Sequence, residues 1–263
     1  MQKAREGRSR MQNGRKNLAL FLFLVFSLPL VCLFFEQTLK NAAVRFVLYG
    51  IQAASPTIAA AFLLCRNGQA KAFVSQSFCK GPFKTAVLLP AALACATILP
   101  AKLLFCCLTG AGFAFQSISL AKWVVVFWAL FAEEAGWRGY LQPLLKRHAA
   151  HPWAVPGVVG VVWCLWHYHF YLQAPLNLPP MLFLLSCIVE SYLYTFLMDM
   201  AGGDLLSAMV YHFSWNLLAN AVGLSPAQSA GSSMPYLILV GLEMLALALL
   251  WRVQKARPGR QSR

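Results

Sequence analysis

The chain places most of its interior polar chemistry in four short stretches. These are residues 133–138, 163–167, 199–204 and 212–216. The first, second and fourth lie inside apolar runs that are long enough to cross a bilayer. A charged side chain at mid-membrane costs roughly 2.5–3.5 kcal/mol on insertion scales, and the chain has only 8 acidic residues. We therefore interpret these stretches as a functional site inside a membrane.

The two adjacent acids of the first stretch are expected to have different partners. Glu134 and Arg138 are four residues apart with the acid first, which favours an ion pair on one helix face. Glu133 lies about 100° further around the helix and is not committed to that arginine. Paired carboxylates in different environments can separate a structural charge from a general base. We expect Glu133 to be the free carboxylate.

Two histidines at mid-span each have a partner on the same helix face. Trp163 precedes His167 by four residues, so the indole can fix the imidazole and shield it from lipid. His212 and Asn216 are likewise one turn apart. With a free glutamate they supply a base, an imidazole to share a proton or hold a metal, and two donors for an oxyanion. The alternative is that each histidine is a hydrogen-bonded packing residue.

The remaining interior ionisable residues receive no catalytic role. His169 is two residues beyond His167 and so faces another way. Glu190 and Glu243 lie in apolar runs and are expected to be interhelical hydrogen-bond partners of unassigned function. Asp199 is expected at a helix end, and Asp204 as a helix N-cap.

The composition indicates a polytopic membrane protein. Hydrophobic residues make up 59% of the chain, charged residues 11%, and the mean hydropathy is +0.61, which leaves too little polar surface for a soluble globule. Apolar runs occur at about 18–35, 42–65, 85–108, 121–145, 153–172, 181–199, 204–222 and 235–251. We predict an all-α transmembrane helical bundle of about eight spans in one domain. The eight cysteines show no CxxC pair, so we expect inert buried thiols.

Basic residues gather at the two ends of the chain. The net charge is +14, and residues 1–16 carry six Lys/Arg while 252–263 carry five. The positive-inside rule then puts both ends in the cytoplasm, beside the headgroups of the lipid bilayer, and a nucleic-acid partner is not expected. We divide the chain into a basic cytoplasmic tail (1–17), N-terminal transmembrane helices (18–118), a catalytic core (119–222), a last transmembrane helix (223–251) and a second basic cytoplasmic tail (252–263).

Residue counts along the spans predict the depth of the site. At 1.5 Å per residue in a core of about 30 Å, Glu133 and His212 both fall about 12 Å from the cytoplasmic face. His167 falls at about 21 Å from that face, so a tilt or a displaced boundary of its span must bring it to the other two. We expect one water-accessible cavity, open to the cytoplasmic side and lined by Glu133, Glu134, His167, His212 and Asn216.

The order of the motifs resembles one known family. EExxxR (Glu133, Glu134, Arg138), aromatic-xxx-His (Trp163, His167) and HxxxN (His212, Asn216) are similar to the motifs of the CPBP intramembrane proteases. This family is also called the CAAX prenyl protease 2 / lysostaphin resistance protein A-like or Abi family. The resemblance covers about 119–222. The run Trp163–His167 resembles bacterial members, whereas the eukaryotic pattern has Phe at the first position, so we expect a bacterial cell membrane.

The resemblance implies a role for each motif residue. Glu133 and His167 would activate the attacking water, and His212 and Asn216 would stabilise the oxyanion. Glu134 and Arg138 would orient the site. The family is labelled a metalloprotease, yet a glutamate-driven mechanism without metal is also argued for it. Glu133, His167 and His212 could hold zinc with one open position, and the sequence does not decide the point.

The function that we predict is an intramembrane endopeptidase. Its substrate would be a membrane-associated peptide or protein, either CAAX-like or of the bacteriocin type. A non-enzymatic bacteriocin-immunity or membrane interaction protein on the same fold is the main alternative. A proton-coupled transporter is a third, because buried Glu/His sets also serve proton relays. It predicts an internal repeat between the two halves, which the sequence does not show.

Overall fold

The structure is a computed structural model that describes residues 2–173 and 177–256. Within these residues the regular elements are all helices, which confirms the predicted all-α class. In chain order they are α1 (Gln2–Thr38), α2 (Ala42–Ala53), α3 (Ser55–Arg66), α4 (Ala70–Ser77), α5 (Leu89–Thr109), α6 (Leu120–Ala132), α7 (Gln142–Lys146), α8 (Val155–Trp166), α9 (Tyr168–Gln173), α10 (Pro180–Met200), α11 (Leu205–Ala221) and α12 (Met234–Ala256). Two π-helical segments, Lys84–Leu88 and Ala135–Leu141, precede α5 and α7, and short 3-10 turns occur at Pro152–Ala154 and Pro226–Gln228.

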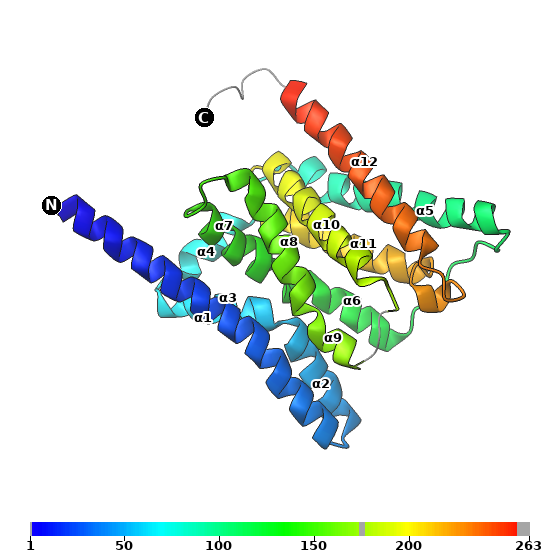
Figure 1. Ribbon diagram of the computed structural model, residues 1–263, viewed down its shortest axis with the longest axis horizontal. Coiled ribbons are helices and arrows are strands. Elements are labelled where there is room, and N and C mark those ends of the chain that lie inside the picture. Colours follow the sequence, from blue (N-terminus) through cyan, green and yellow to red (C-terminus); the bar gives the residue numbers. More distant parts are fainter. Residues whose placement is uncertain (1, 174–176, 257–263) are drawn as a thin grey trace.

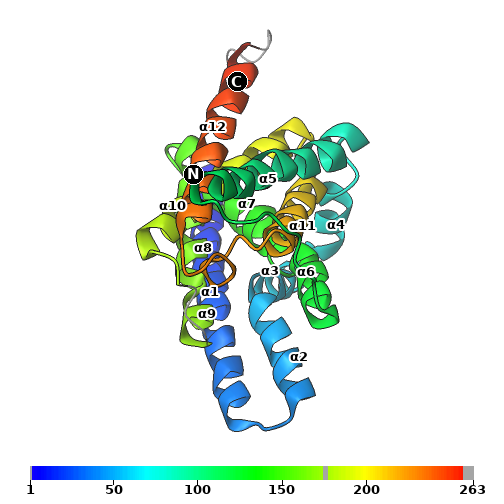
Figure 2. The same cartoon turned by 90° about the vertical axis from the view of Figure 1, so that its right-hand side faces the viewer.

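The helices form one bundle with the two longest, α1 and α12, on opposite flanks. In Figure 1, α1 runs along one flank and α12 and α5 along the other, with α8, α10 and α11 between them. Helix α10 packs against α8, α11 and α12, while α5 packs against α11 and α12. The start of α1 and the end of α12 lie at the same end of the bundle in both views (Figures 1 and 2).

Each of the eight apolar runs contains helix, but not every run is one continuous span. Among the described residues, four stretches are long and apolar enough to cross a membrane: Asn13–Thr38, Lys84–Thr109, Pro180–Met200 and Met234–Arg252. Helices α2 and α3 meet at a 64° bend and together could form a fifth. Helices α6, α8 and α11 have only 13, 12 and 17 residues. The chain is an integral membrane protein, and eight spans stays a prediction.

The two basic ends continue helices within the described residues. Residues 2–17 of the predicted N-terminal tail form the first turns of α1, and residues 252–256 the last turns of α12. Residues 1 and 257–263 of the two predicted tails lie outside the described residues.

Two glycines allow neighbouring helices to pack closely near the motif residues. A Cβ on Gly136 would overlap the backbone of Pro56 at the start of α3, so the π-helical segment can pack there only without a side chain. A Cβ on Gly160 would lie 2.7 Å from the carbonyl oxygen of Cys187, where α8 crosses α10. Pro56 also explains the bend between α2 and α3, since proline lacks the N–H that a continuous helix would use.

Candidate active site

Two of the motif residues stand where helices stop inside the bundle. Helix α6 ends at Ala132, directly before Glu133, and α8 ends at Trp166, directly before His167. The π-helical segment Ala135–Leu141 follows the first break. Such segments are rare in helical proteins and frequently occur at functional sites, because the extra residue per turn redirects side chains. The breaks therefore aim Glu133 and His167 differently from their neighbours in the sequence.

The predicted ion pair of the first motif is present and fully buried. Arg138 Nη1 donates to Glu134 Oε1 at 3.0 Å, and neither side chain is exposed. Arg138 Nη2 also donates to Ser191 Oγ of α10 at 3.0 Å. The guanidinium lies 4.0 Å from the ring centroid of Tyr194 and 4.6 Å from that of Trp163. The two terminal nitrogens of the arginine are thus held by hydrogen bonds, and its guanidinium lies against two aromatic rings.

Glu134 has a second partner that the sequence did not indicate. Its Oε1 lies 2.8 Å from Nδ1 of His212, on α11. A carboxylate accepts hydrogen bonds, so Nδ1 carries the proton and Nε2 is the nitrogen left for chemistry. Arg138, Glu134 and His212 consequently form a chain of charge-assisted contacts from the π-helical segment to α11.

Glu133 has a different environment from its neighbour. Its Oε2 accepts a hydrogen bond from the indole Nε1 of Trp163 at 2.8 Å. Its Oε1 lies 3.9 Å from Nε2 of His212, too far for a direct hydrogen bond. The expected division of the two acids is confirmed, with one locked to a cation and the other facing an imidazole.

His167 is fixed by the backbone of its own helix. Its Nδ1 lies 2.7 Å from the carbonyl oxygen of Trp163, so Nε2 is again the free nitrogen. The Trp163 ring meets the imidazole edge-on with centroids 5.5 Å apart. The expected Trp163–His167 contact is present, but the polar group of the indole serves Glu133 instead.

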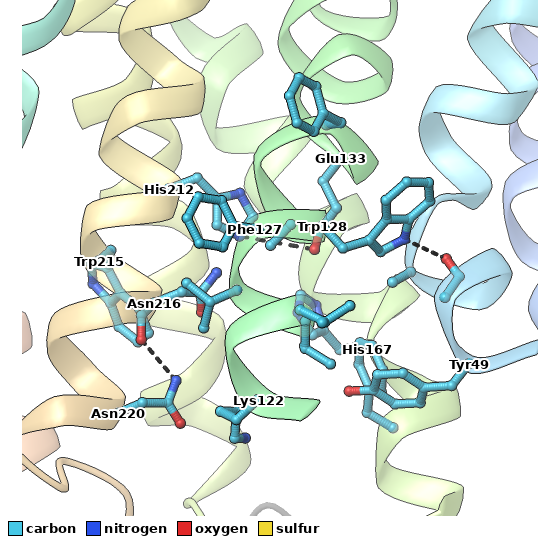
Figure 3. A pocket seen from close by; sticks show the side chains of 18 of the residues that line it. Tyr49, Lys122, Phe127, Trp128, Glu133, His167, His212, Trp215, Asn216 and Asn220 are labelled. Atoms are coloured by element: carbon cyan, nitrogen blue, oxygen red, sulfur yellow. Dashed lines mark hydrogen bonds and ion pairs between the residues drawn. The ribbon is translucent and has the colours of Figure 1, made fainter. Parts of the chain in front are cut away.

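These side chains share one cavity of about 1050 Å³. Glu133, His167, His212 and Asn216 all line it, and Figure 3 shows them around a common space. Glu134 was expected in the lining, but its side chain is completely buried behind His212. The other walls are largely aromatic and aliphatic, including Phe127, Trp128, Phe170 and Phe183.

The lining of the cavity extends toward one end of the bundle. Its lining continues along α2 and α6 to Phe46 and Lys122, near the starts of these helices. Those starts lie at the end of the bundle opposite to the chain ends (Figures 1 and 2). The buried π-helical segment lies behind Glu133, and the opening to the cytoplasmic side stays a prediction.

The same cavity contains an acid to which the sequence gave no role. Glu190 lines it, and its Oε1 accepts from Ser186 Oγ at 2.6 Å; Ser186 Oγ in turn lies 2.8 Å from the hydroxyl of Tyr236 on α12. The spacing of four residues between Ser186 and Glu190 within one apolar run could have indicated this hydrogen bond. The predicted interhelical role of Glu243 is confirmed, since its Oε1 accepts from Trp215 Nε1 of α11 at 3.0 Å.

Three further ionisable residues, Asp204, His169 and Asp199, lie outside the three motifs. Asp204 is an N-cap whose carboxylate accepts from the backbone N–H of Leu206, as predicted. His169 is buried against the Trp166 carbonyl and does not line the described cavity. Asp199 is the second-last residue of α10.

The three side chains named as zinc ligands do not form a metal site in this arrangement. Among the described residues, no group of three or more His, Cys, Asp or Glu side chains is placed to hold a metal ion. Glu133 Oε2 is engaged by the Trp163 indole, and that same ring contacts His167 on one side and His212 on another. All eight cysteines are free thiols, but the expected burial is wrong for half of them, since Cys65, Cys79, Cys95 and Cys107 are exposed.

Comparison with known proteins identifies the segment that carries this geometry. Residues 115–218 match the family model described as type II CAAX prenyl endopeptidase Rce1-like. The matched segment contains all three motifs. A search of curated proteins found no significant match.

Proposed function

Residues 115–218 make this chain a member of the CPBP intramembrane proteases, with an Rce1-like domain, and from this premise we propose that it is an active endopeptidase. It would hydrolyse a peptide bond of a membrane-associated substrate. The observation that carries the proposal is the 3.9 Å separation of Glu133 Oε1 and His212 Nε2 across a cavity in an apolar bundle. In a hydrogen-bonded ion pair these two atoms would lie about 3 Å apart. The longer separation leaves both atoms able to contact a third group, such as a water molecule.

The first step that this geometry supports is activation of water by Glu133. A water molecule can lie about 2.8 Å from each of two polar atoms that are themselves 3.9 Å apart. As its oxygen attacks the peptide carbonyl carbon, Glu133 takes one proton and later returns it to the leaving amine. The hydrogen bond from Trp163 to Oε2 keeps Oε1 directed at this water.

The second requirement is a donor for the oxyanion of the tetrahedral intermediate. His212 can supply it through Nε2 when the imidazole is protonated, because Glu134 at Nδ1 balances the imidazolium charge. Asn216 lies one turn further along α11 and lines the same cavity, so its amide is the second donor. Arg138 holds Glu134 in place and is a positioning residue.

His167 completes the set as a second proton acceptor. With Nδ1 committed to the Trp163 carbonyl, the neutral ring presents Nε2 as an acceptor. It reaches the cavity from α8, whereas His212 reaches it from α11. Glu133 and His167 would share the proton of the attacking water, with His212 and Asn216 on the oxyanion side.

The cavity walls support a substrate that is largely apolar near the scissile bond. Aromatic side chains from α2, α6 and α9 surround the polar residues, and several of them are exposed on the bundle surface. A lipid-modified peptide of the CAAX type, or the hydrophobic part of a bacteriocin-type peptide, would match such walls.

The experiment compares membrane peptides in three strains, expressing the intact protein, no protein, or Glu133→Gln. We expect peptides to accumulate equally in the last two strains and to be cleaved in the first. Mass spectrometry of the membrane fraction would identify them. If Glu133→Gln behaves like the intact protein in this assay and in any immunity assay, the endopeptidase proposal is wrong and the non-enzymatic alternative stands.

A further inference from the structure

A second cavity lies on the other side of the segment that bears Glu133 and Arg138. It has a volume of about 1070 Å³ and is bounded by the first part of α1, the α3–α4 region, the π-helical segment with α7, and the end of α10. Arg138 belongs to its lining, whereas Glu133 belongs to that of the apolar cavity. One short segment thus separates two cavities.

The lining of this polar cavity has one sign of charge. Lys80, Arg138, Arg147 and His148 contribute to it, and no Asp or Glu does among the described residues. Amide and hydroxyl donors stand between them, namely Asn17, Asn67, Gln69, Gln76 and Ser77. Such a set of cations and neutral donors, without a competing carboxylate, complements an anion.

The buried cation next to this cavity is Arg138. Arg138 is completely buried, and its two terminal nitrogens donate to Glu134 and Ser191. Its Nε has no hydrogen-bond partner among the described residues. A guanidinium has five N–H donors, and a buried donor left unpaired destabilises a protein. Because this side chain is fully buried, it contributes positive charge behind the wall rather than a donor that a ligand in the cavity contacts.

The position of the cavity indicates where the anion comes from. It lies at the end of the bundle where α1 begins and α12 ends, and the first turns of α1 carry the six Lys/Arg of residues 2–16. Helix α4 turns Gln76 and Ser77 to the cavity and leaves Val74 60% exposed. An apolar surface next to cationic and amide donors suits a lipid, with acyl chains outside and the headgroup inside.

We propose that the polar cavity is a binding site for a phosphate group, supplied by the headgroup of an anionic phospholipid. The ligand would contact Lys80 and Arg147 at the rim and add a negative charge beside Arg138. Because Arg138 holds Glu134, and Glu134 holds His212, the site is connected to the catalytic cavity by consecutive contacts. Binding itself does not depend on proteolysis.

The experiment measures ligand binding to the full-length protein in neutral detergent by native mass spectrometry. Short-chain phosphatidic acid is titrated in one arm, short-chain phosphatidylcholine in the second, and inorganic phosphate in the third. The test variant is Lys80→Gln with Arg147→Gln, both exposed side chains outside the catalytic cavity. The matched control is Lys84→Gln with Arg252→Gln, which removes the same charge from exposed positions outside the polar cavity.

We expect phosphatidic acid to bind the wild type and the control equally, and to bind the test variant at least tenfold more weakly. Phosphatidylcholine should bind none of them specifically. Binding of inorganic phosphate with the same dependence on Lys80 and Arg147 would support the phosphate site and show that the acyl chains are dispensable. Equal binding to the test and control variants would overturn the proposal, as would equal binding of the two lipids. Thermal unfolding of each variant without ligand checks that the test variant is folded.

Discussion

The two cavities of this protein share a wall but have opposite character. The cavity proposed to be catalytic is lined by aromatic and aliphatic side chains around a few polar groups, Glu133 among them. The polar cavity is lined by cations and amides, with Arg138 in its wall. Glu134 lies between them, buried, and bonded to Arg138 on one side and His212 on the other.

The contrast shows how a membrane protein can keep two adjacent carboxylates in an apolar bundle. The negative charge of Glu134 is balanced by Arg138, whose cation is in turn supported by Ser191 and two aromatic faces. Glu133 has no cation of its own within hydrogen-bonding distance among the described residues, and instead receives an indole N–H. One acid is therefore available to stabilise the arrangement and the other to react.

The largest expected effect is the loss of cleavage rate when Glu133 is replaced. Glu133→Gln keeps the shape but cannot accept a proton, so it should lower the rate of substrate cleavage by about 10²–10⁴ while leaving thermal stability nearly unchanged. The measurement is cleavage of the identified peptide in proteoliposomes. Glu190→Gln is the matched control, because this acid lines the same cavity, and it should retain most of the activity. Equal losses of cleavage rate in Glu133→Gln and Glu190→Gln would contradict the assignment of Glu133 as the general base.

The next effect concerns the contribution of the Glu134–Arg138 ion pair to stability. Arg138→Ala leaves Glu134 buried without its cation and should reduce the free energy of unfolding by about 3–5 kcal/mol. Combining it with Glu134→Gln should recover part of this loss, since the stranded charge is then removed. Arg147→Ala, an exposed arginine of the polar cavity, serves as the control and should change stability by no more than about 0.5 kcal/mol. Identical unfolding of the single and double variants would mean that the two residues are not coupled.

A smaller effect tests how Glu133 is aimed. Trp163→Phe removes the 2.8 Å hydrogen bond to Oε2 and leaves a ring in place. A hydrogen bond to a charged group contributes about 1.5–3 kcal/mol, so the rate should fall roughly ten- to a hundredfold. Trp166→Phe is a close control, because that indole donates to Ser55 and not to Glu133. The assignment fails if both tryptophan variants cleave substrate at the same rate.

The smallest expected effect concerns the hydrogen bond between Arg138 and Ser191. Ser191→Ala removes one acceptor of Arg138 but leaves Glu134, so the free energy of unfolding should fall by about 1 kcal/mol. Chemical denaturation in detergent would measure the change. A loss as large as that of Arg138→Ala would show that Ser191, rather than Glu134, is the main partner of the cation.

The local part of the site was predictable from the sequence because helical spacing determines it. The contact between Glu134 and Arg138, the separation of Glu133 from that pair, and the neighbouring faces of His212 and Asn216 all follow from residues within one or two turns. Apolar run lengths were likewise sufficient for the all-α class. These features need no knowledge of how the helices pack.

The rest depends on packing between distant segments. Glu134 and His212 are 78 residues apart, and Trp163 lies 30 residues after Glu133, so neither hydrogen bond has a local signal. Continuous helices were assumed through Glu133 and His167, whereas the structure breaks at both. The apolar runs carry no local signal for these breaks, which redirect the 134–141 segment and the side chain of His167.

The placement of the two chain ends has a consequence for the number of membrane crossings. The start of α1 and the end of α12 lie at the same end of the bundle. Each crossing moves the chain to the other side of the bilayer, so ends on one side require an even number. Five crossings, obtained by adding the bent α2–α3 pair to the four long helices of the described residues, would separate the ends. A topology reporter fused to either terminus should accordingly give the same signal.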